Sequence, residues 1–127
     1  MELEKLKALL LEWQKVLRMQ DWDFSIKIKR AFDMPIKDVQ GCCTYVLASR
    51  RVLINLLDPN DYDPAFIDEQ DLEKTMVHEM LHPMVAQFED EKAFNADNME
   101  YASCEQTIDT IAKALVTLKR GAMMGSE

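Results

Sequence analysis

The stretch "DWDFSIKIKR", residues 21–30, decides the fold because its hydrophobic residues recur with a period of two. The apolar side of this stretch consists of Trp22, Phe24, Ile26 and Ile28. Such alternation is typical of a β-strand with one buried face. The residues before it, 2–19, instead repeat leucines and Trp13 at helical spacing. The sequence therefore predicts a helix that leads into a sheet.

Two further β-rich stretches follow, residues 42–48 and 50–57, and a short polar break separates them. This arrangement predicts two strands that form a hairpin. The segment between the first and second predicted strands, 31–41, contains a proline and ends in glycine, which predicts a loop. The acidic segment 58–71, with two prolines, predicts another loop.

Helical spacing returns in the second half of the chain. Apolar residues predict one helix from about 68 to 88 and another from about 97 to 119, with Gly121 as its stop. Residues 121–127 are then expected to form a flexible tail. Strands that are grouped together and followed by helices indicate an α+β fold. We expect an N-terminal helix, a small three-stranded sheet and two helices, in a single domain spanning 1–127.

Composition narrows the classes of function. The chain has 127 residues and a formal net charge of −8, which argues against nucleic acid and against anionic membranes as partners. No apolar run is long enough for a membrane span, and the glutamate-containing start does not resemble a secretory signal. Three cysteines, two of them adjacent, are a poor basis for a disulfide framework. We therefore expect a cytoplasmic protein.

The stretch "VHEMLHPM", residues 77–84, contains both histidines of the chain. At about 100° per residue, His78 and His82 lie roughly 40° apart around a helix and roughly 6 Å apart along it, so both rings can reach one ion. Glu79 points away from direct ligation and can contact a water that the metal holds. This is the geometry of the H-E-x-x-H motif, in which two imidazoles bind Zn²⁺ and the carboxylate is the general base. The motif predicts hydrolysis by a metal-activated water.

A catalytic zinc usually has three protein ligands. Since no histidine remains, the third must be a carboxylate or a thiolate. An antiparallel final helix that returns toward His82 brings Glu105 level with the histidines, with Glu100 as the second choice. One turn after Glu105, the carboxylate of Asp109 could accept the free ring N–H of a ligating histidine. The predicted metal ligands are therefore His78, His82 and Glu105, oriented by Asp109.

The residues "HEMLH" at 78–82 and "EQTID" at 105–109 resemble the gluzincin branch of the zinc metallopeptidases. The arrangement is similar to the minimal, single-domain members of bacteria and their phages. The resemblance implies a zincin-like fold in which a glutamate from a following helix completes the site. It also implies a peptide or protein substrate that lies extended beside an edge strand, for which residues 51–57 are the candidate.

The chain departs from that pattern at two points. Pro83 follows the second histidine directly, which predicts a kink in the helix rather than its end. No further histidine is available to stabilise a tetrahedral oxyanion. Tyr45 and Tyr62 are the candidates for this role, and the sequence does not choose between them.

Two alternatives stay open at this stage. A metal hydrolase that resembles peptide deformylase would use Cys42 or Cys43 as the third ligand. Adjacent strand residues point to opposite faces, so at most one of these thiols could bind the metal. The other alternative is a non-catalytic zinc-binding module that docks a protein partner through the acidic segment 58–71.

Overall fold

The structure, a computed structural model, describes residues 2–65, 67–86 and 99–125. Three α-helices and one three-stranded sheet make up the described part of the chain, which confirms the α+β class. Their order is α1 (Leu3–Val16), β1 (Asp23–Lys29), β2 (Gly41–Val46), β3 (Arg51–Leu57), α2 (Leu72–Ala86) and α3 (Met99–Gly125). Short 3-10 turns occur at η1 (Ala31–Asp33), η2 (Leu47–Ser49) and η3 (Pro59–Asp61).

The sheet has the strand order β1-β3-β2. β2 and β3 pair antiparallel, which confirms the predicted hairpin, whereas β1 pairs with β3 in parallel. The expectation that residues 51–57 form an edge strand is wrong, because β3 has a neighbour on each side. Its nearly continuous burial agrees with this central position. The edge strand that borders α2 is β2.

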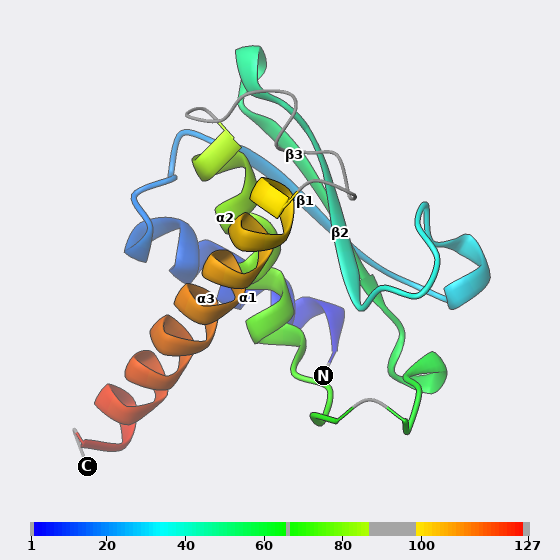
Figure 1. Cartoon of the computed structure of the whole chain (residues 1–127). Helices are drawn as coiled ribbons and strands as arrows, with labels where there is room; N and C mark the ends of the chain where they lie inside the picture. The colour runs from blue at the N-terminus through cyan, green and yellow to red at the C-terminus, as the bar shows by residue number, and fades with distance from the viewer. Residues whose placement is uncertain (1, 66, 87–98, 126–127) are drawn as a thin grey trace.

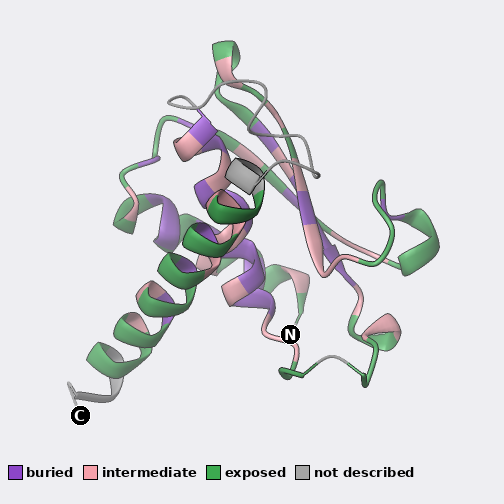
Figure 2. Ribbon diagram, viewed as in Figure 1, coloured by how far each residue is buried: buried purple, intermediate pink, exposed green. Residues whose placement is uncertain are grey.

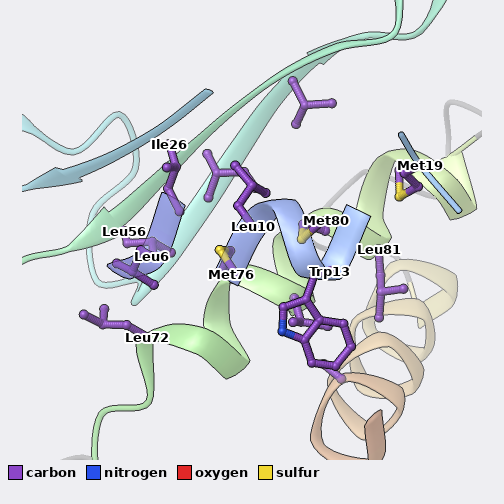
Figure 3. Packing of buried hydrophobic residues seen from close by; sticks show 14 of the residues in the cluster. Leu6, Leu10, Trp13, Met19, Ile26, Leu56, Leu72, Met76, Met80 and Leu81 are labelled. Carbon is purple, nitrogen blue, oxygen red and sulfur yellow. The ribbon is translucent and has the colours of Figure 1, made fainter. Parts of the chain in front are cut away.

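The helices cover one face of this sheet, and α2 lies between the strands and α3 (Figure 1). The core forms where α1, α2 and the sheet meet, around Trp13, Met76 and Met80 (Figure 3). Ile26 and Ile54, paired across β1 and β3, are both buried in it, as the period-two pattern predicts. The outer surface of α3 is exposed along most of its length (Figure 2). Buried Ile108, Ala112 and Val116 on its inner side attach it to α2.

A buried carboxylate joins the three helices. Glu73 of α2 accepts a hydrogen bond of 2.8 Å from the indole nitrogen of Trp13 in α1 and one of 3.1 Å from Arg120 in α3. Lys119 of α3 lies 3.4 Å from the same carboxylate. Because a buried charge is costly without such partners, this cluster determines how α2 is set against its two neighbours.

The helix ends differ from the sequence expectation in two places. α2 begins at Leu72 because Asp71 caps it: the backbone N–H of Lys74 donates to the Asp71 carboxylate at 3.1 Å. It then continues through buried Pro83 to Ala86, and the predicted extension to residue 88 lies outside the described residues. α3 does not stop at Gly121 but reaches Gly125, so the helix includes part of the expected tail. Glycine usually ends a helix by adopting a positive φ. Gly121 does not have a positive φ, so the helix continues through it.

No helix in the described ranges combines the length and the apolarity that a bilayer span requires.

Close contact at Gly41 brings the edge strand against α2. A Cβ at this position would lie 2.8 Å from the methyl carbon of Thr75 and 3.2 Å from Leu56 Cδ2. The backbone of Gly41 is not left-handed, so its lack of a side chain matters here for space alone. Gly41 therefore permits β2 to begin in direct contact with the first turns of α2.

We expect Gly41→Ala to lower the free energy of unfolding by about 1–3 kcal/mol, because the added methyl overpacks this contact. Thr75→Ser removes the methyl that would clash and keeps the hydroxyl, which donates to the backbone carbonyl of Asp71. Urea denaturation of both single variants and the double variant forms a double-mutant cycle. The double variant should regain much of the loss. Strictly additive effects would show that contact with the Thr75 methyl is not the reason why Gly41→Ala lowers the free energy of unfolding.

Candidate metal centre

The two histidines project from neighbouring turns of α2 toward α3. Their ring centroids lie 5.1 Å apart, as expected for residues four apart on a helix. Both side chains are largely buried, with 14% exposure for His78 and 11% for His82. The rings therefore have little freedom to move, and each keeps a nitrogen directed toward the neighbouring helix.

Glu105 of α3 lies between the rings. Its carboxylate oxygens are 3.0 Å from Nε2 of His78 and 2.6 Å from Nε2 of His82. These two hydrogen bonds, with the one from His78 first, hold the pKa of Glu105 far below its usual value. The structure thus brings Glu105 to the histidines, at the level expected from an antiparallel return. Arg120 of α3 contacts Asp71 at the opposite end of α2, which shows that the two helices run antiparallel.

Asp109 lies one turn further along α3, on the other side of the His78 ring. Its Oδ1 is 3.2 Å from Nδ1 of His78 and 3.2 Å from Nζ of Lys74. Burial works against ionisation of Asp109, but a hydrogen bond from Lys113 and the charge of Lys74 hold its pKa at about 2. An ionised Asp109 accepts the Nδ1 proton of His78 and leaves Nε2 as the nitrogen available to a metal.

The charge environment of His78 is acidic. Burial opposes protonation of this ring, yet the hydrogen bond to Glu105 and the charge of Glu79 outweigh it and raise the pKa of His78. Carboxylates that attract a proton to a ring nitrogen also attract a divalent cation, which competes for the same lone pair.

Glu79 points toward the sheet rather than toward α3. Its carboxylate is buried and lies 4.0 Å from Nε2 of His78, further than either oxygen contact of Glu105. Burial raises its pKa above the usual range for a glutamate. The thiol of Cys43, on β2, is its hydrogen-bond partner, and burial raises the pKa of that thiol too. Glu79 is therefore beside the histidine nitrogens, with a longer ion-pair contact to His78 than the one that Glu105 makes.

The adjacent cysteines diverge, as expected for neighbours on a strand. Cys43 faces α2, whereas Cys42 packs against Met34 and Leu57 in a separate apolar cluster. No disulfide joins Cys42, Cys43 or Cys104 in the described part of the chain. Of the two thiols weighed as ligands, Cys43 is the one that reaches the histidine cluster, through its contact with Glu79.

A cavity of about 800 Å³ opens between β2, the segment that leads into it, and helices α2 and α3. The histidines, Glu79, Glu105 and Asp109 all lie on its wall, and so do both cysteines and Tyr45. Tyr62 does not line this cavity, and its hydroxyl donates to the backbone carbonyl of Asp68. The sequence did not choose between the two tyrosines, but in the structure Tyr45 lines the cavity and Tyr62 does not.

The donor atoms lie close enough together to form a possible metal-binding group. Ligand atoms about 2.0–2.1 Å from zinc at tetrahedral angles are roughly 3.3 Å apart. Glu105 Oε2 lies 3.0 Å from Nε2 of His78, and Glu105 Oε1 lies 2.6 Å from Nε2 of His82, both shorter than that value. Ligand atoms of His78, Glu79 and His82 also lie within 4.8 Å of one another. Of the two carboxylates, Glu105 contacts both rings, whereas Glu79 lies 4.0 Å from Nε2 of His78. The side chain of Glu100, the second choice, lies outside the described residues.

Two features of the site were missed from the sequence. Lys74 shares a helix face with His78, and the i, i+4 spacing was a signal that could have revealed it. The contact between Cys43 and Glu79 depends on how the strand packs against the helix, for which the sequence carries no local signal.

Comparisons of the chain with protein-family models, curated proteins and solved structures find no match.

Proposed function

We propose that the protein is a zinc metallopeptidase whose metal ligands are His78, His82 and Glu105. The observation that carries the proposal is a single carboxylate, Glu105, in contact with Nε2 of both histidines. Two imidazoles and one carboxylate form a known ligand set of catalytic zinc, and they leave a fourth position open. The cavity beside that position gives access to a substrate.

Glu79 is the general base in this proposal. Zinc, when bound in such a site, lowers the pKa of a coordinated water to near 7 and polarises a carbonyl group. Glu79 accepts the proton as the water oxygen adds to the carbonyl carbon. It then delivers the proton to the amide nitrogen as the C–N bond breaks. A carboxylate whose pKa is raised by burial suits a group that must alternate between base and acid.

The substrate in this proposal is an extended peptide that lies along β2. In the described part of the sheet, β2 is an edge, and it borders the cavity together with α2. Main-chain groups on the open side of an edge strand can pair with a peptide, which would hold its carbonyl over the ligand cluster. Cysteines that form no disulfide in the described part of the chain agree with a reducing compartment such as the cytoplasm, which we keep as part of the proposal.

Zinc analysis and a proteolysis assay test the proposal together. The purified protein should contain about one zinc per chain and should cleave an unfolded polypeptide. A chelator should stop cleavage, and added zinc should restore it. Zinc bound without any cleavage would favour the non-catalytic module. A protein that takes up no zinc would exclude both.

Asp109→Asn should weaken zinc affinity by roughly 10–100-fold, the usual effect of removing a carboxylate that orients a ligating histidine. The amide keeps the shape of the side chain but no longer stabilises the Nδ1 proton of His78 as an anion does. Competition with a chromogenic chelator measures the affinity. Lys113→Met is the matched control, because Lys113 contacts Oδ2 of Asp109 at 3.0 Å from an exposed position. Equal affinity in the Asn variant and the control would remove Asp109 from the site.

A further inference from the structure

The buried carboxylate of Glu79 has few contacts that could fix its direction. In the part of the chain that the structure describes, Nε2 of His78 is 4.0 Å away, which is too far for a hydrogen bond. The hydrogen bond that Glu79 does make is with the thiol of Cys43 on β2. Glu79 is the general base of the proposed function, on which this inference rests, and a base must be aimed at the proton that it accepts.

The packing of β2 against α2 brings these two side chains together. Gly41 lies so close to Thr75 that a Cβ at position 41 would be 2.8 Å from the Thr75 methyl carbon. Two residues further along the strand and four along the helix, Cys43 contacts Glu79. Two strand residues advance roughly 6.6 Å and four helical residues roughly 6 Å, so the strand and the helix stay level over this distance. The short side chain of Cys43 can therefore reach Glu79 across the interface.

The sulfur of Cys43 is the donor in this contact. Burial, and then the charge of Glu79, raise the pKa of the thiol, so the sulfur keeps its proton. A carboxylate that acts as a base is ionised and only accepts hydrogen bonds. A thiol is a weak donor, but a hydrogen bond to a charged acceptor is stronger than one between neutral groups. The contact therefore runs from the S–H group to the carboxylate.

The adjacent thiol has a different environment. Cys42 packs with Met34 and Leu57 in a separate apolar cluster. Its hydrogen-bond partner is the side chain of Asn55. Both thiols border the cavity, so they differ in the group that they contact rather than in their access to it. This contrast provides a matched control for the role of Cys43.

We propose that Cys43 is a positioning residue for the reaction, whose thiol donates a hydrogen bond to the Glu79 carboxylate and holds it toward the attacking water. One carboxylate oxygen accepts this bond, and the other accepts the proton of the water. Cys43 contacts neither the metal nor the reacting carbonyl, and it acts through Glu79 alone. Its loss lets the carboxylate turn away from the water, which slows the chemical step without a change in substrate affinity.

Infrared spectroscopy of the metal-free protein tests the contact itself. The S–H stretching band moves to lower frequency when a thiol donates a hydrogen bond. The difference spectrum between the wild type and Cys43→Ala separates the band of Cys43 from those of Cys42 and Cys104. Glu79→Gln should move this band to higher frequency, because a neutral amide oxygen is a weaker acceptor than a carboxylate. A band that stays in place would show that Cys43 does not donate to Glu79, and the inference would be wrong.

Kinetics of the zinc-loaded variants test the role. Cys43→Ala should keep its zinc content and its KM, while kcat falls by roughly 10–100-fold, in the range that a misplacement of about 1 Å can cost. Cys43→Ser replaces one donor with another and should recover most of that loss. Cys42→Ala is the matched control, because it removes the neighbouring thiol, whose partner is Asn55, and it should leave kcat unchanged.

Full activity of Cys43→Ala would overturn the inference and leave the proposed function intact. An equal loss in Cys43→Ala and Cys43→Ser would also overturn it, since the packing of the sulfur rather than its proton would then be the cause. If the zinc-loaded wild type does not cleave peptides, the proposed function fails, and the inference about its base fails with it whatever the infrared band shows.

Discussion

Glu79→Gln is expected to lower kcat and kcat/KM together by roughly 10²–10⁴-fold, the range that general base catalysis contributes. The amide matches the glutamate in size but cannot accept the proton of the attacking water. Zinc content should not change, because Glu79 lies 4.0 Å from the nearest histidine nitrogen, whereas Glu105 contacts both rings. Proteolysis kinetics and metal analysis on the same preparation measure both quantities.

The variant should also fold as well as the wild type. Burial raises the pKa of Glu79, which means that its ionised form is costly inside the protein, and a neutral amide avoids that cost. Glu69→Gln, at an exposed loop position, is the control for loss of one carboxylate. If Glu79→Gln cleaves peptides at the wild-type rate, Glu79 is not the base. Loss of zinc in this variant would instead make Glu79 a ligand.

Most of the fold could be predicted because each element carries a periodic signal of its own. In β1 the exposed Asp23, Ser25 and Lys27 alternate with half-buried Phe24, buried Ile26 and half-buried Ile28. The hairpin of β2 and β3 follows from two β-rich runs with a short break. The central position of β3 was missed, although its run of apolar residues is typical of a strand with neighbours on both sides. The C-terminal end of α3 was missed because a glycine alone does not stop a helix.

Part of the site could also be predicted, because it depends on helical geometry alone. His78 and His82 are four residues apart on one helix, which determines their proximity. The position of Glu105 was predicted from the rise per residue of two antiparallel helices. In the structure its carboxylate contacts both histidine rings. The calculation agrees with the structure because α2 and α3 run antiparallel, as the contact of Arg120 with Asp71 shows.

The remaining part of the site depends on how the sheet packs against α2. Tyr45 and Tyr62 are equivalent in sequence terms, and only the structure shows that Tyr45 lines the cavity and Tyr62 does not. The partnership of Cys43 with Glu79 arises in the same way. Contacts between a strand and a helix some thirty residues apart leave no periodic trace, so they require the structure.

Glu105→Gln is expected to abolish stoichiometric zinc binding. The neutral amide cannot replace the carboxylate whose two oxygens contact the two Nε2 atoms, and it no longer offsets the charge of the cation. His78→Ala and His82→Ala should also lose zinc, because each removes a ligand nitrogen. In the wild type, zinc at 100 times its Kd should raise the free energy of unfolding by about 2.7 kcal/mol. In all three variants that increment should fall close to zero, as measured by thermal unfolding with and without zinc.

Two further substitutions separate this ligand set from its competitors. Cys43→Ser should keep zinc, because the thiol contacts Glu79 rather than the position between the rings. Glu100→Gln should also keep zinc if Glu105 is the third ligand. The opposite pattern, zinc retained without Glu105 but lost without Cys43, would support the arrangement that resembles peptide deformylase. Loss of zinc in both Glu105→Gln and Cys43→Ser would indicate a closed site with four protein ligands, which leaves no position for a reacting water and favours a structural role.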